Sequence, residues 1–529
     1  MRYRFLSLLP TLLAGVTLLC CTRPQETAKP SPPPPASASA LPPASAAPSA
    51  SLAPAPTALP SPPVRSVTLL YTSDEHGWML PHVTKGGGAA ALLQQWVRSE
   101  KHCLPDHPGG CEDATTLAIS GGDNWTGPAI SSVALGKPMA EIMHSIGYVA
   151  SAMGNHELDF GQANFADNAR IQGCDFLSAN VHWAEGHTPL PVKPFVIVRR
   201  NQVRIGVIGL STTSTPTHLL PTSSEGLTFE DEEQTLARVV PEVWKAGADA
   251  VVITAHVCPD VMQAIVGKHP EWNIAFVGAG HCHSLKSLMA GKVPVLEPAA
   301  ELTWYVRVPI TVDLARPQQE RLLSVQPQLV ELGSLPSPAE LTAPVKTLQA
   351  DIQKWKASSD EKLGQVIGFS GQGITRESPA MVKWLLGAWR KQLHADVAIM
   401  NRHGMRQDLT PGEVHVSSVW DILPFENKIV TLKLTGQYLV ENATCCHGLI
   451  DGMKLINKAW VLSDGRKVDP AASYVVVTPD YAFFGGSGFR FKDQATDVQF
   501  GTDWRDSIVE WMKAHKSTRG QPLETLVFH

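Results

Sequence analysis

The chain has 529 residues, too many for one ordinary hydrophobic core, so we expect two globular domains with additional tails. Hydrophobic residues make up 43% of the chain and charged residues 18%, which is ordinary for a soluble globular protein. The formal net charge is −5 and no run rich in Lys or Arg occurs, which argues against a nucleic acid polymer as a lasting partner.

The N-terminus predicts export. Residues 1–20 carry two arginines and then an apolar stretch too short to span a bilayer, which is typical of a secretory signal peptide. The ending LLCC resembles a bacterial lipoprotein processing site with Cys21 as the lipid-bearing residue. Modification of Cys20, or an ordinary signal with a stray cysteine pair, are the alternatives. We expect a secreted protein, periplasmic or at the cell surface, that a lipid anchors to a bacterial membrane.

Residues 21–65 are almost entirely Pro, Ala and Ser and cannot bury a core, so they predict a disordered tether. Seven cysteines follow Cys21, an odd number. Cys103 and Cys111 flank a loop rich in Pro, Gly and Asp and could pair in an oxidising compartment. The adjacent Cys445 and Cys446 suggest packing or a redox role.

The body that follows alternates short β-rich segments with helical stretches, which predicts an α/β domain. Five apolar segments each stop at a cluster of polar residues: VTLLYTSDEHG, TTLAISGGDNW, GYVASAMGNHE, ADAVVITAHV and NIAFVGAGHCH. Helices are expected at residues 90–100 and in DEEQTLARVVPEVWKAGA. In such domains ligands bind outside the carboxyl ends of the strands, where all five polar clusters lie.

Two later helices are expected near and beyond the end of this domain. The first begins with Thr342 as N-cap and Pro344 in its first turn, and one of its faces carries Val345, Leu348, Ile352 and Trp355. The second begins at Ser378 and Pro379 and places Met381, Leu385 and Trp389 at helical spacing.

The polar clusters at the strand ends combine carboxylates with imidazoles. These suit borderline divalent ions such as Mn²⁺, Zn²⁺, Fe²⁺ or Co²⁺ better than Ca²⁺, which prefers oxygen ligands. Two ions ~3.5–4 Å apart and bridged by one carboxylate would use all of these side chains.

The motifs D-E-H, G-G-D-N, G-N-H-E and G-H-C-H, in this order, resemble those of the calcineurin-like metallophosphoesterases. Together with GNHELDFG and the downstream segment they resemble the secreted 5′-nucleotidase family from about Val67 to Phe491. The resemblance implies a metallophosphoesterase catalytic domain at residues 66–335, a β-sandwich flanked by helices. A linker helix at 336–360 and a smaller α/β 5′-nucleotidase-type substrate-binding domain at 361–529 would follow.

The resemblance also assigns metal ligands. It implies one ion held by Asp74, His76, Asp123 and His283, and a second held by Asp123, Asn155, His256 and His281. The family often has glutamine where this chain has His283, and histidine is the commoner residue in the wider superfamily.

His156 would face the substrate, where it stabilises transition-state charge or protonates the leaving oxygen. Asp159 would hold the imidazole in its tautomer and orientation. Glu157 is interpreted as a cap of local backbone, and Cys282 as a small filler or a thiolate ligand. The remaining histidines of note are interpreted as core or surface residues: His82, His144, His182, His187, His218 and His447.

In the second domain ADVAIMNRHGMR and LPFENKIV resemble the family motifs Asn-x-Gly-Gly-x-Arg and Pro-Phe-Gly-Asn. By this resemblance Arg376 and Arg406 clamp the substrate phosphate. Phe425 and Tyr481 stack on a base, and Asn401 and Asn427 add polar contacts.

The chain departs from the family pattern at several positions. Arg402 and His403 replace motif glycines, and Arg402 is equally well interpreted as a surface arginine. Ser487 stands where the family has the aspartate that binds ribose hydroxyls, so recognition of ribose is expected to be weak or absent.

These residues predict dinuclear metal-dependent hydrolysis of phosphate monoesters, with a small anionic phosphoester as the partner. 5′-Nucleotides are the leading substrates, and nucleotide-sugars and cyclic nucleotides are further candidates. The alternatives are a hydrolase of a non-nucleotide phospho- or sulfo-ester and an anchored binding protein without catalysis.

Overall fold

The structure is a computed structural model that describes residues 63–82 and 85–527. The predicted signal peptide, the predicted lipid attachment at Cys21 and nearly all of the predicted tether lie outside these residues. Within the described part of the chain, no helix has the length and apolar character needed to cross a membrane. Residues 61–529 form one compact unit.

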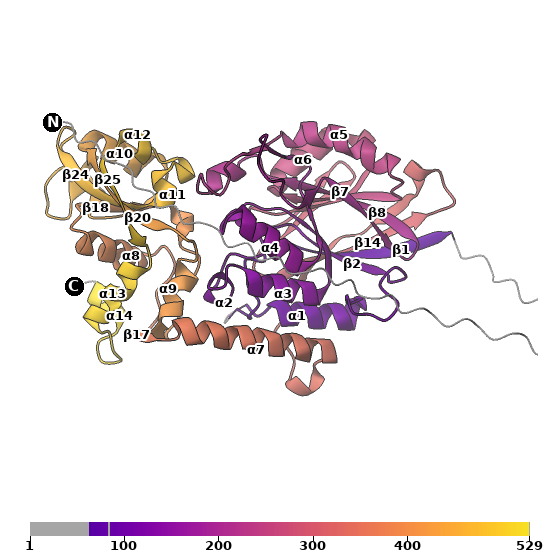
Figure 1. The fold of residues 1–529 in the computed structure, drawn as a ribbon, viewed down its shortest axis with the longest axis horizontal. Helices are drawn as coiled ribbons and strands as arrows, with labels where there is room; N and C mark the ends of the chain where they lie inside the picture. The colour runs from indigo at the N-terminus through magenta and orange to yellow at the C-terminus, as the bar shows by residue number, and fades with distance from the viewer. Residues whose placement is uncertain (1–62, 83–84, 528–529) are drawn as a thin grey trace, which may run out of the picture. The chain divides into compact units, whose positions relative to one another are not determined.

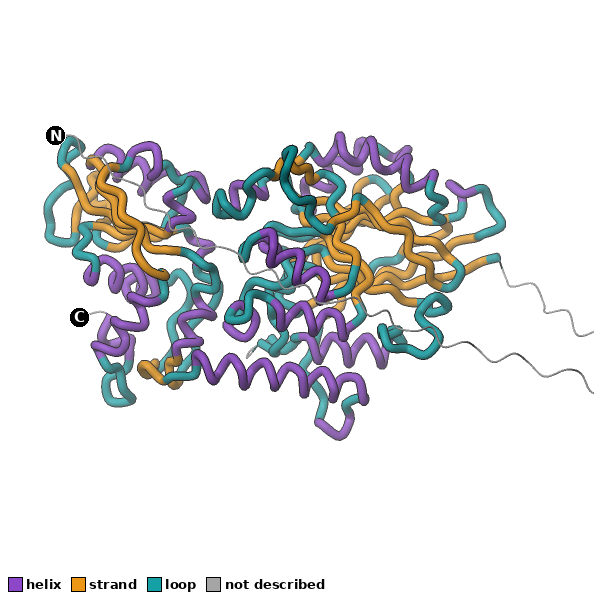
Figure 2. Tube along the Cα trace, in the orientation of Figure 1, coloured by secondary structure: helices purple, strands orange, loops and turns teal. Residues whose placement is uncertain are grey.

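The first half of the described chain is a sandwich of two β-sheets. Figure 1 shows helices on its two outer sides, and Figure 2 shows the strands enclosed between them. The first sheet contains, in spatial order, β15 (Leu322–Val325), β14 (Trp304–Asp313), β1 (Val64–Thr72), β2 (Thr116–Ser120), β3 (Tyr148–Ala152), β4 (Asp175–Leu177) and β6 (Val192–Lys193), with β16 (Gln328–Glu331) also on β14. The second contains β12 (Leu285–Ala290), β13 (Val293–Pro298), β11 (Ile274–Ala279), β10 (Ala250–His256), β8 (Val203–Ser211) and β7 (Phe195–Arg200).

Apolar side chains fill the three layers of this sandwich. Between the sheets, one buried cluster includes Leu69, Val207, Val252 and Phe276. A second cluster packs the outer face of the first sheet against α1 (Ala89–Gln95), α3 (Lys137–Ile146) and α4 (Gln162–Gln172). A third packs the second sheet against α5 (Glu232–Lys245) and α6 (Pro259–Lys268). The expected α/β sandwich flanked by helices is confirmed.

Strand direction brings the polar motifs together. β1, β2 and β3 pair in parallel, and so do β8, β10 and β11. Their carboxyl ends therefore lie at one edge of each sheet, and all five predicted strands end there. The helix expected at residues 90–100 is α1 followed by a π-helical turn at Trp96–Glu100.

The linker helix is α7 (Ala343–Leu363), with Thr342 as N-cap and Pro344 in the first turn as expected. Val345, Leu348 and Ile352 are buried, and α7 packs against α1, α2 (Ala129–Ser132) and α3. The C-terminal end of α7 lies next to α9 (Val416–Ile422) of the following segment.

The C-terminal segment is built on a second α/β core. Its sheet contains, in spatial order, β21 (Leu449–Asp451), β18 (Val397–Met400), β24 (Ser473–Pro479), β20 (Lys428–Thr435) and β25 (Thr496–Asp503). One face packs on α8 (Pro379–Gln392) and α13 (Asp506–His515), the other on α10 (Gly436–Cys445), α11 (Asp480–Phe483) and α12 (Phe491–Gln494). α8 begins as predicted, because the Ser378 hydroxyl accepts a hydrogen bond from the backbone N–H of Met381.

Candidate metal and catalytic site

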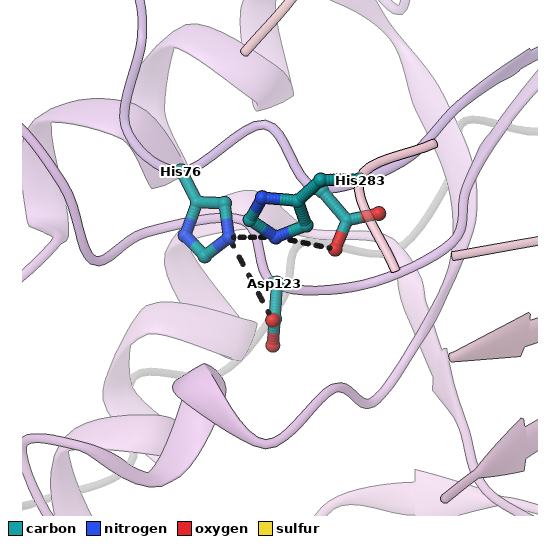
Figure 3. A group of neighbouring side chains, drawn as sticks. His76, Asp123 and His283 are labelled. Carbon is teal, nitrogen blue, oxygen red and sulfur yellow. Dashed lines mark hydrogen bonds and ion pairs between the residues drawn. The ribbon is translucent and has the colours of Figure 1, made fainter. Parts of the chain in front are cut away.

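The first group of candidate ligands combines loops from both sheets. Asp74 and His76 follow β1, Asp123 follows β2 and His283 follows β11, and their ligand atoms all lie within 4.8 Å of one another. His76 Nε2 lies 3.0 Å from His283 Nε2 and 3.8 Å from Asp123 Oδ2, as Figure 3 shows. His283 Nε2 is 3.3 Å from Asp74 Oδ1. Four ligand atoms thus point at one place.

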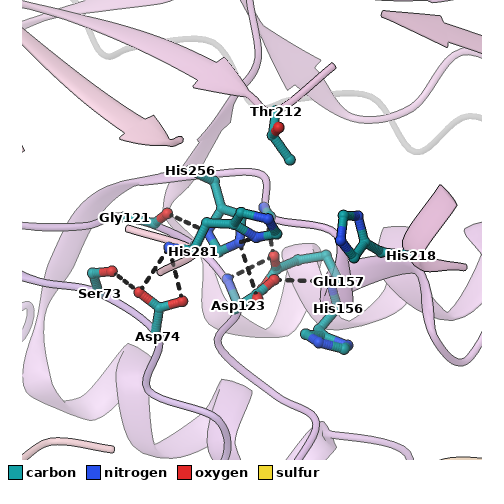
Figure 4. Close-up of polar contacts among 12 residues, drawn as sticks. Ser73, Asp74, Gly121, Asp123, His156, Glu157, Thr212, His218, His256 and His281 are labelled. Carbon is teal, nitrogen blue, oxygen red and sulfur yellow. Dashed lines mark hydrogen bonds and ion pairs between the residues drawn. The ribbon is translucent and has the colours of Figure 1, made fainter. Parts of the chain in front are cut away.

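The second group shares Asp123 with the first. His256 Nε2 lies 3.0 Å from Asp123 Oδ2 and 3.2 Å from His281 Nδ1 (Figure 4). Asp123, His256 and His281 again meet within 4.8 Å. A carboxylate common to two adjoining groups is the arrangement that a dinuclear centre needs.

Asn155 supplies an independent test of whether a cation fits here. Its side chain is buried, and Oδ1 has no hydrogen-bond partner among the described residues. A buried polar oxygen without a partner costs ~1–3 kcal/mol, so something must compensate for it. A divalent cation beside Asp123 would bind this oxygen and remove the cost.

The backbone of these loops is strained where ligands are presented. Asp74, His76, Asp123, His281 and His283 all have positive φ, between 46° and 74°. A residue other than glycine in this region costs ~1–3 kcal/mol and persists only where the surroundings hold it. Backbone hydrogen bonds hold it here, for example from Asp74 N–H to the Gly122 carbonyl at 2.9 Å.

Two of the histidines have their tautomers fixed by carbonyl groups. His76 Nδ1 donates to the Thr126 carbonyl at 2.9 Å, and His256 Nδ1 donates to the Gly121 carbonyl at 2.9 Å. Since a carbonyl can only accept, each Nδ1 carries a hydrogen. Nε2 is therefore the nitrogen of each ring that faces the other candidate ligands, and it can bind a metal once it is deprotonated.

The electrostatic field also favours positive charge at this place. Burial opposes ionisation of both His256 and Asp123. Even so, the Asp123 carboxylate raises the pKa of His256 to about 10, and the neighbouring histidines hold the pKa of Asp123 well below its usual range. A divalent cation would supply the positive charge in place of a proton, so the donor set fits borderline divalent metals.

Glu157 organises the loops that follow β2 and β3. Its buried carboxylate accepts hydrogen bonds from the backbone N–H groups of Asp123 (2.9 Å), Asn124 (2.6 Å) and Gly154 (2.7 Å). The interpretation of Glu157 as a cap of local backbone is confirmed. Burial and the Asp123 charge raise its pKa to about 7.

His156 and Asp159 form a hydrogen-bonded pair beside the ligands. His156 Nδ1 lies 2.8 Å from Asp159 Oδ2, and the His156 backbone N–H donates to Asp123 Oδ1 at 2.8 Å. Burial lowers the pKa of the imidazole, but the Asp159 and Asp123 carboxylates outweigh it and leave the pKa raised. The Phe425 ring stacks on His156 with centroids 5.3 Å apart.

A cavity of about 550 Å³ opens onto these groups. It is lined by every residue expected to bind substrate, namely Arg376, Asn401, Arg406, Phe425, Asn427, Tyr481 and Ser487. Arg406 Nη2 reaches to 3.1 Å from His76 Nε2, and Arg376 Nη1 donates to the Arg406 carbonyl at 3.0 Å. The Arg406 guanidinium therefore lies beside the first group of candidate ligands, and the Arg376 guanidinium lies against the Arg406 backbone.

The two residues expected to stack on a base, Phe425 and Tyr481, both line the cavity. The Tyr481 hydroxyl donates to the Thr217 carbonyl at 3.3 Å and lies 3.5 Å from Ser487 Oγ. Asn401 Oδ1 is buried without a partner in the described structure.

The structure places Arg402 and His403, the two departures from the glycine motif, in different surroundings. Arg402 forms an ion pair with Glu377 at 2.6 Å and does not line the cavity, which fits its interpretation as a surface arginine. His403 lines the cavity, as does Glu426 at the glycine of the second motif. In the sequence, their place at glycine positions of the family motifs is the feature that points to His403 and Glu426 as cavity residues.

Two further residues line the cavity although no sequence motif indicates it. His218, interpreted from the sequence as a core or surface histidine, lines the cavity and meets the His281 ring edge-on at 5.0 Å. Glu301 also lines the cavity and pairs with His82 at 3.0 Å.

The cysteines form three disulfides in the described residues: Cys103–Cys111, Cys258–Cys282 and Cys445–Cys446. The first was considered from the sequence. The interpretation of Cys282 as a filler or a thiolate ligand is wrong, because its sulfur is bonded to Cys258. Within the same residues Cys174 is the free cysteine.

Comparisons with known proteins agree with this geometry. A family model for the 5′-nucleotidase C-terminal domain matches residues 357–442. The protein UshA of Escherichia coli K12 is 23% identical over 523 residues, covering 87% of this chain and 92% of UshA.

Two solved structures share the fold. The 5′-nucleotidase precursor of Thermus thermophilus superposes with a TM-score of 0.71 at 19% identity, covering 86% of this chain and 97% of that one. The sulfate thiohydrolase SoxB of the same species reaches a TM-score of 0.68 at 16% identity, covering 88% and 97%. The resemblance noted from the sequence motifs is confirmed.

Proposed function

From the premise that this chain is a two-domain relative of the 5′-nucleotidases, we propose that it is a dinuclear metal-dependent hydrolase of phosphate monoesters. One observation carries the proposal: two ligand groups share Asp123, and their loops open into the cavity that holds the His156–Asp159 pair and two arginines. A protein that only binds its ligand needs neither the pair nor the shared carboxylate.

In this proposal Asp74, His76, Asp123 and His283 hold one ion of the Mn, Zn, Fe or Co class. Asp123, Asn155, His256 and His281 hold the other. The bound ions would supply positive charge that activates water and neutralises phosphoryl oxygens.

The chain's own side chains do the rest. Arg406 and Arg376 orient the phosphate through their forked donors. His156 uses Nδ1 for Asp159, which leaves Nε2 to donate a proton to developing charge or to the leaving oxygen. Burial opposes protonation of His156, but the Asp159 and Asp123 carboxylates raise its pKa and so favour the protonated form.

The leading substrates are 5′-nucleotides, because Phe425, Tyr481, Asn401 and Asn427 all line the cavity as base-binding residues would. Ser487 favours a second candidate, a non-nucleotide phospho- or sulfo-ester, since a short uncharged side chain there provides no carboxylate for ribose. Export and lipidation on Cys21 are part of the proposal, and three disulfides suit an oxidising compartment.

The test is phosphate release from AMP, ribose-5-phosphate and an aryl phosphate by the manganese-loaded protein. We expect AMP to be preferred and His156→Ala to lower kcat by about 10²–10⁴-fold with bound metal unchanged. His182→Ala, at an exposed histidine, is the matched control. Equal rates on all three esters would favour the non-nucleotide substrate, and bound metal without turnover on any ester would favour a binding protein.

A further inference from the structure

The Cys258–Cys282 disulfide lies inside the candidate metal site. Cys258 comes two residues after His256, and Cys282 stands between His281 and His283. Both cysteines line the cavity. One covalent bond therefore joins the two segments that carry three of the proposed ligands.

Beyond the ends of β10 and β11, few other interactions join these two segments. The ladder between β10 and β11 ends at the pair Ala255 and Ala279, before any of the three histidines. Beyond it, the Gly280 N–H donates to the Val257 carbonyl at 3.3 Å, a long hydrogen bond. The backbone at His281 (φ 74°) and His283 (φ 52°) is meanwhile in the strained left-handed region.

Cys282 is fixed from a second side as well. Its backbone N–H donates to Glu297 Oε1 at 2.9 Å, and the Ser284 hydroxyl donates to the other oxygen of that carboxylate. Glu297 belongs to β13, so this contact fixes the loop after β11 to the sheet. It does not fix that loop to the loop after β10, and the disulfide is the covalent bond that joins the two loops.

We propose that the Cys258–Cys282 disulfide is a redox-sensitive positioning element of the metal centre. In the oxidised state it holds His256 and His281 at the spacing that retains the second ion, and reduction releases that ion. This inference rests on the proposed dinuclear centre, and it makes an active enzyme conditional on an oxidising compartment.

The redox step is a two-electron exchange with a dithiol. The Cys258–Cys282 bond breaks, each sulfur gains a proton, and the dithiol closes to a cyclic disulfide. The β10 and β11 loops are then free to separate, and two sulfur ligands appear beside the histidines. Because sulfur prefers Zn²⁺ to Mn²⁺, reduction is expected to change which metal the site retains as well as how tightly. A disulfide-bearing oxidant reverses the step.

The experiment compares bound metal in paired cysteine variants of the exported protein. The double variant Cys258→Ser/Cys282→Ser removes the Cys258–Cys282 disulfide, which we call the brace, and is the brace variant. Cys103→Ser/Cys111→Ser removes a disulfide that does not line the cavity and is the matched control. Manganese per chain is measured by elemental mass spectrometry after dialysis against a graded chelator.

We expect the control to keep about two ions per chain, as the dinuclear geometry requires. The brace variant should lose one ion at a chelator concentration about 10–100-fold lower, the range seen when a group supporting a ligand is removed. Equal retention of both ions by the two variants would overturn the proposal.

A second measurement covers the case in which the brace variant does not fold. The variant Cys103→Ser/Cys111→Ser/Cys445→Ser/Cys446→Ser leaves Cys258–Cys282 as the reducible bond of the described chain. Reduction of this folded protein should release one ion as two thiols appear, and reoxidation should restore it. Two new thiols with no release would overturn the proposal.

Failure of the brace and failure of the proposed function give different results. Wild-type protein that binds no metal would overturn both. Two ions retained regardless of the disulfide, with turnover of an ester, would overturn the brace alone. Redox-dependent retention without turnover would support the brace and overturn the proposed hydrolase.

Discussion

Ser487 occupies a backbone conformation that would suit the aspartate expected at its position. Its φ is 57°, in the left-handed region that Asp and Asn tolerate better than most residues. The side chain lines the cavity and lies 3.5 Å from the Tyr481 hydroxyl. A carboxylate could therefore be introduced without forcing the backbone to move.

Ser487→Asp is expected to raise kcat/KM for AMP about 10-fold relative to the 2′,3′-dideoxy analogue. The reason is that a hydrogen bond to a charged acceptor is worth ~1.5–3 kcal/mol. Steady-state kinetics on both substrates measure the effect. Ser487→Asn, with a similar shape and no charge, is the control, and an equal gain on both substrates would contradict a role in reading ribose.

Residues at strand ends were predictable, and residues on connecting segments were not. Asp123 and Asn155 directly follow parallel strands, whose carboxyl ends must meet at one edge, so their meeting place follows from the strand pattern. His218 lies on a short 3₁₀ turn far from any motif, and only tertiary packing brings it to His281. The pairing of Cys258 with Cys282 was equally hidden, because sequence does not fix disulfide connectivity.

At the scale of elements, α2 and α9 meet through one half-buried aspartate. The Ala129 N–H at the start of α2 donates to Asp421 Oδ1 of α9 at 2.7 Å. Burial raises the pKa of Asp421 from 3.8 to about 6, although the Ala129 N–H and the Lys356 charge act against the rise. The folded protein thus binds this proton more tightly than the unfolded chain does.

This pKa difference predicts a pH dependence with a definite sign. Between about pH 4 and 6 the folded state keeps the Asp421 proton that the unfolded state has lost, so the free energy of unfolding falls as pH rises. Asp421→Asn retains the acceptor oxygen and cannot ionise, so its stability should fall less than that of the wild type through this window. Denaturant midpoints at pH 4, 5, 6 and 7 measure the difference. Asp167→Asn, at an exposed residue, is the control, and parallel curves for wild type and Asp421→Asn would contradict the argument.

The sequence predicted whether a segment forms a helix or a strand more reliably than it predicted the local geometry of that element. The apolar face and the Thr342–Pro344 start predicted α7 well, because local spacing and capping decide a helix of that length. The π-helical turn at Trp96–Glu100 was not foreseen. Its first residue, Trp96, packs against Tyr148 and Tyr305 of distant strands, and local spacing does not encode such contacts.

At the scale of the molecule, the cavity is lined by residues that precede α7 in the sequence and by residues that follow it. Arg406 reaches His76, Phe425 stacks on His156, and the Tyr481 hydroxyl reaches the Thr217 carbonyl. In this arrangement a substrate held by the C-terminal residues would face the candidate metal ligands. We expect the C-terminal segment to rotate away to admit substrate and release product, a hypothesis that rests on these contacts.

A cross-link across this interface should stop turnover. Ala129→Cys/Asp421→Cys joins α2 to α9 at a contact outside the cavity, and air oxidation closes the pair. We expect kcat to fall at least about 10-fold with bound metal unchanged, because product release then requires a locked interface to open. Ala129→Cys/Asp421→Ser, which cannot cross-link, is the control. Full turnover by the cross-linked protein would contradict rotation.

The left-handed backbone at five ligand positions has a consequence for evolution. Glycine and asparagine adopt that conformation at little cost, so either residue can replace a ligand such as His281 and leave the loop in place. A β-branched residue there would disturb the fold itself. One substitution at such a position can therefore weaken metal binding and spare the scaffold, so a chain with this architecture can lose activity without losing its fold.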